Sequence, residues 1–160
     1  MTRITPCLWF DRNAEEAANF YAATFPDSSV DAVNRAPADY PSGKSGDVLT
    51  VEFTVMGMKF VGLNGGPQFK FDEAISFQIA CENQQEIDYF WSKLTEGGKE
   101  IACGWLKDKF GLSWQVVPTV LYAMLLDSDR AKVRRVTNAF LHMKKFDITA
   151  LTRAFDGGPS

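Results

Sequence analysis

The stretch ISFQIACENQQEIDYFW, residues 75–91, repeats in outline an earlier stretch, ITPCLWFDRNAEEAANFY, residues 4–21. In each, a short apolar run ends in polar residues and is followed by a segment with helical spacing of apolar side chains. Phe20 and Tyr21 in the first copy correspond to Phe90 and Trp91 in the second, which gives a period of about 70 residues. This repeat predicts two similar modules, each beginning with a strand and a helix.

The first module continues with strands. Asn13 is the expected N-cap of its helix, and the expected inward residues are Ala17, Phe20, Tyr21, Thr24 and Phe25. A second strand is predicted from about Ser29 to Arg35. VLTVEFTV, 48–55, and MKFVGLN, 58–64, alternate as a hairpin does and flank a Met-Gly turn. The intervening segment, 36–47, has the composition of a loop, which is either a mobile flap or disordered.

The second module repeats this order. Its helix is predicted over 82–98 and ends in Gly-Gly, with Ile87, Phe90, Trp91 and Leu94 facing inward. Residues 99–106 are expected to be extended, KDKFG to turn, and LSWQVVP, 112–118, to return. The returning strand places Leu112, Trp114 and Val116 on one face, and Ser113, Gln115 and Val117 on the other. Gly111 in this turn matches Gly57 of the first module.

After Pro118 the repeat stops and three helical patterns follow, in 119–127, 130–146 and 147–155. The middle one places Val133, Val136, Phe140 and Met143 on one face. We therefore expect one domain over 1–160. It would consist of a first module over 1–66, a second over 74–118 and a helical tail over 119–156.

The composition restricts the kind of partner. Seventeen Lys and Arg against 20 Asp and Glu give a net charge of −3, which argues against nucleic acid as a partner. No apolar run approaches the ~18 residues of a membrane span, and no cleavable leader is evident, so a soluble, cytoplasmic protein is expected, with no membrane partner. Cys7, Cys81 and Cys103 lack the paired spacing of a zinc site or a disulfide framework and are expected to be small buried hydrophobes.

Beyond the repeat, the chain resembles the vicinal oxygen chelate superfamily, which includes glyoxalase I, bleomycin-resistance proteins and extradiol dioxygenases. Within it, the chain is most similar to the PhnB-like branch, labelled "3-demethylubiquinone-9 3-methyltransferase". The segments that carry this resemblance are ITPCLWFDRNAEEAANFY, VLTVEF, LNGGPQFKF, ISFQIACE, CGWLKDKFGLSWQVVP and MKKFDI. The resemblance implies an α+β fold of two βαβββ modules, which form a curved mixed sheet around a cavity, plus C-terminal helices. It also implies a homodimer.

The resemblance makes a metal site testable, since metal-using relatives take His and Glu ligands from four matched strands. The matched positions in this chain are Thr5, Val61, Ser76 and Gln115. None is a histidine, carboxylate or thiolate, so we expect no metal and no other cofactor. The nearest alternative donors are Cys7, Gln78 and Glu52, while the single histidine, His142, lies outside the repeat.

The same positions predict a polar and aromatic lining for the cavity. The expected lining residues are Thr5, Cys7, Trp9, Ser76, Gln78, Ser113 and Gln115. Such a lining suits hydrogen bonding and stacking with a small planar or amphipathic ligand. In the alternative interpretation, Ser113 and Gln115 only satisfy backbone groups. Trp105 and Trp114 are expected in the core or at a dimer contact rather than on a ligand.

The expected function is therefore binding of a small aromatic or amphipathic molecule without a metal, as in bleomycin-resistance proteins. One alternative is a metal-dependent lyase, isomerase or dioxygenase, in which Glu52 is the best candidate base. The methyltransferase of the family label is disfavoured, because the chain has no glycine-rich turn from a strand into a helix. Whether the protein is an enzyme stays open at this point.

Overall fold

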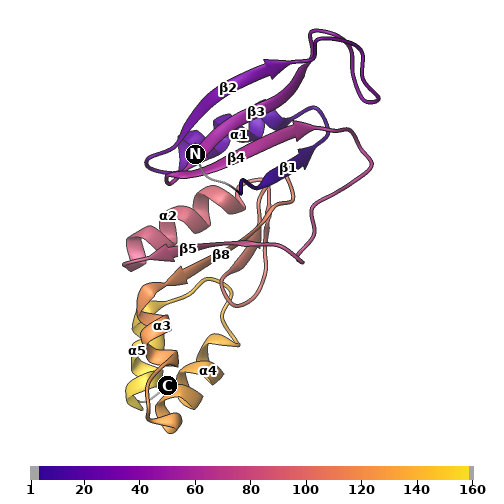
Figure 1. Ribbon diagram of the computed structural model, residues 1–160. Helices are drawn as coiled ribbons and strands as arrows, with labels where there is room; N and C mark the ends of the chain where they lie inside the picture. Colours follow the sequence, from indigo (N-terminus) through magenta and orange to yellow (C-terminus); the bar gives the residue numbers. More distant parts are fainter. Residues whose placement is uncertain (1–3, 159–160) are drawn as a thin grey trace. The chain divides into compact units, whose positions relative to one another are not determined.

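The structure, a computed structural model, describes residues 4–158. The chain forms two compact units, of which the first ends at Phe71 and the second begins at Asp72 (Figure 1). The elements of the first unit are β1 (Cys7–Phe10), α1 (Ala14–Thr24), β2 (Ser29–Arg35), β3 (Val48–Val55) and β4 (Met58–Asn64). They form a four-stranded sheet of order β1-β4-β3-β2, in which β1 runs parallel to β4 and the other pairs are antiparallel.

The core of the first unit lies between α1 and one face of this sheet. The alternation in β3 buries Val51, Phe53 and Val55 on the face toward α1. Tyr21 of α1 stacks on Phe53 with ring centroids 6.0 Å apart, and Phe53 stacks on Phe60 of β4 at 5.3 Å. Aromatic packing on alternate strand positions therefore fixes which face of the sheet the helix covers.

The second unit repeats the topology of the first, as the sequence predicted. Its elements are β5 (Phe77–Cys81), α2 (Gln84–Thr95), β6 (Lys99–Glu100), β7 (Trp105–Lys107) and β8 (Ser113–Pro118). The sheet order is β5-β8-β7-β6, with β5 parallel to β8. The four residues predicted to face inward from α2, Ile87, Phe90, Trp91 and Leu94, are all buried. The α+β fold of two βαβββ modules with C-terminal helices is confirmed.

Some predicted details are wrong. The first strand begins at Cys7 rather than Ile4, although the backbone of Pro6 still accepts a hydrogen bond from Val61 N. Asn13 is the N-cap of α1, as predicted, but its side chain makes no capping hydrogen bond; Asn64 Oδ1 accepts from Ala14 N instead, at 3.0 Å. The extended run expected over 99–106 is divided into β6 and β7. It is interrupted because Cys103 and Gly104 both adopt positive φ, 56° and 79°.

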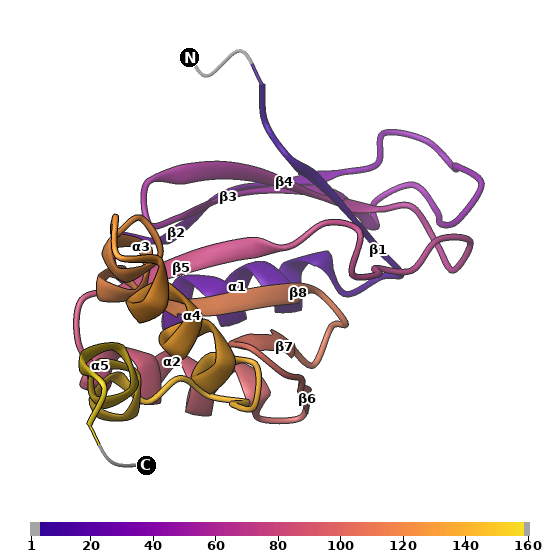
Figure 2. The same cartoon turned by 90° about the horizontal axis from the view of Figure 1, so that it is seen from below.

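The tail forms α3 (Thr119–Leu125), α4 (Arg130–Phe140) and α5 (Ile148–Asp156), and α4 packs against α5 (Figure 2). Helix α4 ends at Phe140, so Met143 lies beyond the helix on which it was predicted. The segment after α4 returns to the module: Cys103 N donates to Met143 O and Gly104 N to Lys144 O, each at 2.8 Å. Within residues 4–158, no helix is long and apolar enough to cross a membrane.

Candidate functional site

Each sheet has one face toward its helix, and we call the opposite face its distal face. Because paired residues on neighbouring strands point to the same side, the register defines rows of side chains across this face. On the first sheet, Cys7, Val61 and Glu52 form one such row. On the second sheet, the corresponding row is Gln78, Gln115 and Trp105. The rows occupy equivalent places because the two sheets share one strand order.

The second row carries a continuous chain of side-chain hydrogen bonds. Tyr122 Oη donates to Gln78 Oε1 at 3.2 Å, and Gln78 Nε2 donates to Gln115 Oε1 at 3.1 Å. Gln115 Nε2 then donates to Ser76 Oγ at 2.8 Å. Three of the predicted lining residues, Ser76, Gln78 and Gln115, are thus brought together by direct contact. We call the four bonded side chains, Tyr122, Gln78, Gln115 and Ser76, the amide chain.

The local sequence explains how the amide chain assembles. Gln78 is the second residue of β5, and the parallel register sets it directly opposite Gln115 in the centre of β8. Ser76 precedes Gln78 by two residues, so an extended backbone turns both to the same side. Strand β8 ends at Pro118 and α3 begins at Thr119, which places Tyr122 one helical turn from the sheet.

Ser113 lies two residues before Gln115 in β8, so its side chain points to the same distal face of the sheet. It is fully buried, with 0 % exposure, and its Oγ has no hydrogen-bond partner among the described residues. A buried hydroxyl without a partner costs about 1–3 kcal/mol. Lys107, which pairs with Ser113 in the ladder, binds Glu73 instead.

The predicted residues of the first unit make no comparable chain. Thr5 is exposed and precedes β1. Trp9 is half-buried; its Nε1 donates to Gly66 O at 2.8 Å and its ring meets the edge of Phe69. Cys7 is exposed, against the expectation of a buried cysteine, whereas Cys81 is buried as expected. The structure therefore gives Trp9 a packing role and leaves Cys7 and Thr5 accessible.

The Tyr122 phenol and the Cys7 thiol, two ionisable groups at these rows, are uncharged at neutral pH. Burial raises the pKa of the Tyr122 phenol above its ordinary value of 10.0, and the nearby Cys81 acts in the same direction. Partial burial of the sulfur likewise raises the pKa of the Cys7 thiol above 9.0. A neutral phenol and two amides offer hydrogen bonds but no ready proton acceptor, which suits binding better than acid–base chemistry.

The donor atoms on the distal faces do not fit a transition-metal ion. In the second row the two amides are bonded to one another and to hydroxyls, and amides are weak ligands for such metals. The first row offers one thiol and one carboxylate, Cys7 and Glu52, on either side of the alkyl side chain of Val61. In the described part of the chain, no three His, Cys, Asp or Glu side chains gather as a metal site would require.

Two residues on or beside this face were not predicted as ligand contacts. Trp105 was expected in the core or at a dimer contact, which stays a prediction; it is half-buried and shares the distal face with Gln115. Tyr122 was seen only as part of a helical pattern. The sequence feature that could have indicated Tyr122 is its position four residues after Pro118, the last residue of the strand that carries Gln115.

The chain is similar to known proteins both in sequence family and in structure. A family model described as 3-demethylubiquinone-9 3-methyltransferase matches residues 2–117. Among solved structures, a PhnB protein from Bacillus cereus is 34 % identical with a TM-score of 0.67, over 74 % of this chain and 100 % of that chain.

A protein from Pseudomonas aeruginosa is 19 % identical with a TM-score of 0.60, over 74 % of this chain and 98 % of its own. At this identity the likeness shows the fold alone. A search of the curated proteins gave no significant match.

Proposed function

The chain belongs to the family described as 3-demethylubiquinone-9 3-methyltransferase, and we propose that this member binds a small planar or amphipathic molecule without a metal ion. The binding surface is the distal face of the second sheet. Its polar contacts come from the amide chain and its flat apolar contact from Trp105. The single observation that carries this proposal is the hydrogen-bonded chain Tyr122–Gln78–Gln115–Ser76.

The amide chain supports ligand binding because it has unused capacity. A glutamine amide offers two N–H donors and an oxygen that accepts twice. In the described structure, Gln78 uses one N–H and one oxygen position, on Gln115 and Tyr122 respectively, and Gln115 likewise uses one of each. Each amide therefore keeps one donor and one acceptor for a ligand.

The chemistry of these groups indicates the class of ligand. They are neutral, so they favour an uncharged polar edge, such as an amide, a phenol or a quinone carbonyl, over an ion. Trp105 is half-buried and lies in the same row as both glutamines, where its ring can cover a flat molecule. The ligand is thus expected to combine one hydrogen-bonding edge with a planar apolar body.

The family description names a methyltransferase, and the chain itself argues for binding instead. Enzymes that hold S-adenosylmethionine in a Rossmann-like sheet use a glycine-rich turn from a strand into a helix. The strand-to-helix junctions of the described chain are Asp11–Asn13, Glu82–Asn83 and the direct step from Pro118 to Thr119, and none of them contains a glycine. Both sheets also contain antiparallel pairs rather than an all-parallel Rossmann order.

The test is a thermal-shift screen against phenols, quinones and aromatic amides, followed by calorimetry of any compound that raises the melting temperature. The replacement Gln115→Leu is expected to weaken binding about tenfold or more, since it removes both a donor and an acceptor. Gln85→Leu, an exposed glutamine of α2 outside the site, is the matched control and should bind like the wild type. Equal binding by both variants, or tight binding of S-adenosylmethionine, would contradict the proposal.

A further inference from the structure

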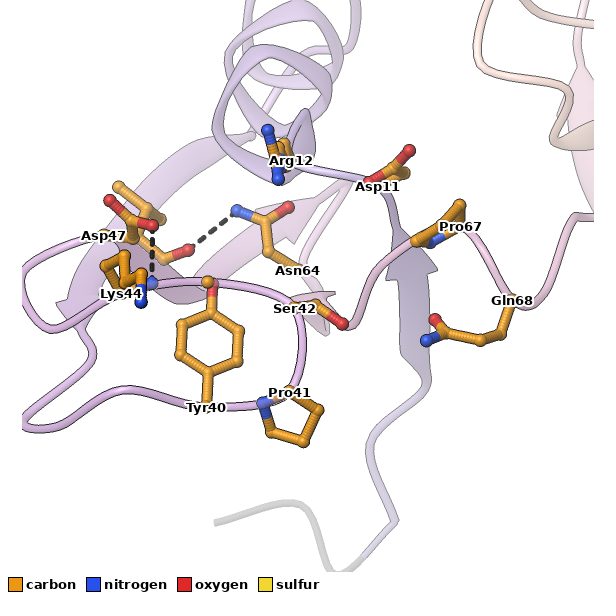
Figure 3. A pocket seen from close by; sticks show the side chains of 12 residues that line it. Asp11, Arg12, Tyr40, Pro41, Ser42, Lys44, Asp47, Asn64, Pro67 and Gln68 are labelled. Atoms are coloured by element: carbon orange, nitrogen blue, oxygen red, sulfur yellow. Dashed lines mark hydrogen bonds between the residues drawn. The ribbon is translucent and has the colours of Figure 1, made fainter.

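The first unit contains a cavity of about 850 Å³ at the end of its sheet (Figure 3). Its walls come from three segments: residues 11–12 after β1, residues within 40–48, and residues 64–68 after β4. The volume is within the range typical of small-molecule sites. None of the residues assigned above to ligand binding lines it.

The walls of this cavity are held in place by hydrogen bonds within the first unit. The loop 36–47 is closed at its base by Ala36 N to Asp47 O and at its tip by the mutual bonds of Tyr40 and Gly43. Ser42 Oγ ties the loop to Gly65 O. The cavity is therefore formed before any ligand arrives, which lowers the entropic cost of binding.

Arg12 is the cation that this cavity leaves available. Lys44 is already paired with Asp39, Nζ to Oδ2 at 3.1 Å, and the Asp47 carboxylate accepts from Lys44 N at 2.8 Å. In contrast, Arg12 makes no hydrogen bond or ion pair with any residue in 4–158 that the structure records. Figure 3 shows the Asp11 carboxylate pointing away from Tyr40 and Asn64.

The backbone conformation of Arg12 is also unusual for a residue that carries a side chain. Its φ is 67°, in the left-handed region where a glycine is unstrained and a side chain is disfavoured. The position is fixed from both sides, by the end of β1 at Phe10 and by Asn64, whose side chain bonds to Ala14 N and Val48 O. A strained residue that carries an unpaired guanidinium into a cavity is typical of a binding position.

We propose that this cavity binds a small monocarboxylate with a flat body, held by two parallel hydrogen bonds from the Arg12 guanidinium. The planar fork of arginine matches a carboxylate, and such charge-assisted pairs are strong. Tyr40 supplies a ring for the flat body, and Gln68 supplies an amide from another wall of the cavity (Figure 3). A phosphate dianion fits less well, because the carboxylates of Asp11 and Asp47, which line the cavity, repel the second charge.

The test uses benzoate as the probe, with benzamide as its uncharged analogue and inorganic phosphate as the competing anion, measured by calorimetry on the full chain. Because benzamide is also a candidate ligand of the amide chain, the three compounds are compared in the Gln115→Leu variant. Benzoate is expected to bind there, and benzamide and phosphate to bind at least about tenfold more weakly. Arg12→Gly should weaken benzoate by about tenfold or more. Its melting temperature should not fall, because glycine suits this backbone. Arg134→Gln, an exposed arginine of α4, is the matched control and should change nothing.

The remaining outcomes separate this site from the amide chain. Gln115→Leu is expected to leave benzoate affinity unchanged. If benzoate fails to bind the wild type, or binds Arg12→Gly as tightly, the proposal is wrong. If affinity is lost in Gln115→Leu instead, the carboxylate binds on the second sheet and the assignment to Arg12 is overturned. Phosphate binding as strong as benzoate would overturn the choice of a carboxylate.

Discussion

Asp108 is the residue on which the turn between β7 and β8 most depends. Its carboxylate is 3 % exposed and accepts from Phe110 N at 2.9 Å, Leu112 N at 3.0 Å and Trp114 Nε1 at 2.8 Å. Loss of a buried carboxylate that accepts several hydrogen bonds is destabilising, because each lost bond leaves a buried donor without an acceptor. The side chain thus fixes the start of the strand that carries Gln115.

We expect Asp108→Ala to lower the free energy of unfolding by about 3 kcal/mol, because three donors lose a charged acceptor. Asp108→Asn keeps one acceptor oxygen and should cost less. Urea unfolding followed by circular dichroism measures both values. If the alanine variant unfolds at the wild-type urea concentration, the turn is held by its backbone alone.

Asp31 gives the protein a stability that depends on pH. Its pKa is lowered from 3.8 to about 2, chiefly by the hydrogen bond from Thr54 and then by those from Ser29 and Lys59. A carboxylate whose folded pKa is depressed stabilises the fold above its unfolded pKa and loses this effect as the pH falls through the folded pKa. The relevant window is therefore from about pH 4 down to about pH 2.

Asp31→Asn is accordingly expected to be less stable than the wild type at pH 7. Because the side chain of Asp31 is partly exposed to solvent, screening should keep the difference below about 1 kcal/mol. The two proteins should converge as the pH approaches 2, which urea unfolding at several pH values can measure. A difference that stays constant over the window would assign the effect to packing rather than charge.

At the scale of elements, the connection from β6 to β7 is shaped by Gly104. Its φ is +79°, and a Cβ at this position would lie 2.5 Å from Phe146 Cε2 and 2.8 Å from Val116 O. The close approach exists because Gly104 N donates to Lys144 O and Gly104 O accepts from Val116 N. One glycine thus joins the tail segment to the second sheet.

Gly104→Ala should therefore destabilise the protein by about 3 kcal/mol, through both backbone strain and overlap with Phe146. Gly111→Ala is the matched control. Gly111 also has a positive φ, +86°, but a Cβ there meets nothing within 4 Å. Its cost should be about 1–2 kcal/mol, from strain alone. Equal losses in urea unfolding would show that the contact with Phe146 contributes little.

The accuracy of the sequence predictions follows from how local each signal is. The strand Ser29–Arg35 and the hairpin of β3 and β4 have the predicted bounds, because alternation and a Met-Gly turn lie within the segment itself. The division of 99–106 was missed because the backbone there follows the distant residues Met143 and Lys144. Ser76, Gln78 and Gln115 could be predicted together because the strands that carry them belong to the repeat. Tyr122 could not, because its position depends on the placement of α3.

At the scale of the whole molecule, the tail lies beyond the family match. The family model ends at residue 117, and the Bacillus cereus protein is covered completely by 74 % of this chain. The tail is nevertheless joined to the family part: Gln84 of α2 donates to Phe146 O and accepts from Ile148 N, and Lys145 pairs with Asp88. Through Tyr122, the tail also adds one member to the amide chain.

The donor atoms of the whole described chain lead to a prediction about metals. Zn, Ni, Mn, Co and Fe(II) salts are each expected to leave the melting temperature of the chelator-treated protein unchanged. A site filled at 100 times its Kd would instead add about 2.7 kcal/mol of stability. A clear rise that disappears in Cys7→Ala or Glu52→Gln would show that the first sheet holds a metal after all and would favour an enzyme.

The hydrogen bonds of the amide chain are all donated in one direction, from Tyr122 towards Ser76, and this direction can be reversed. Its two end members, Tyr122 and Ser76, are hydroxyls, which donate or accept; its two inner members are amides, which exchange N–H for oxygen when they rotate by half a turn. If both amides rotate together, every bond of the chain reforms with opposite polarity. A ligand carbonyl would select one direction and a ligand hydroxyl the other. The same four side chains can therefore serve as a two-way switch of hydrogen-bond polarity and accept molecules of opposite character.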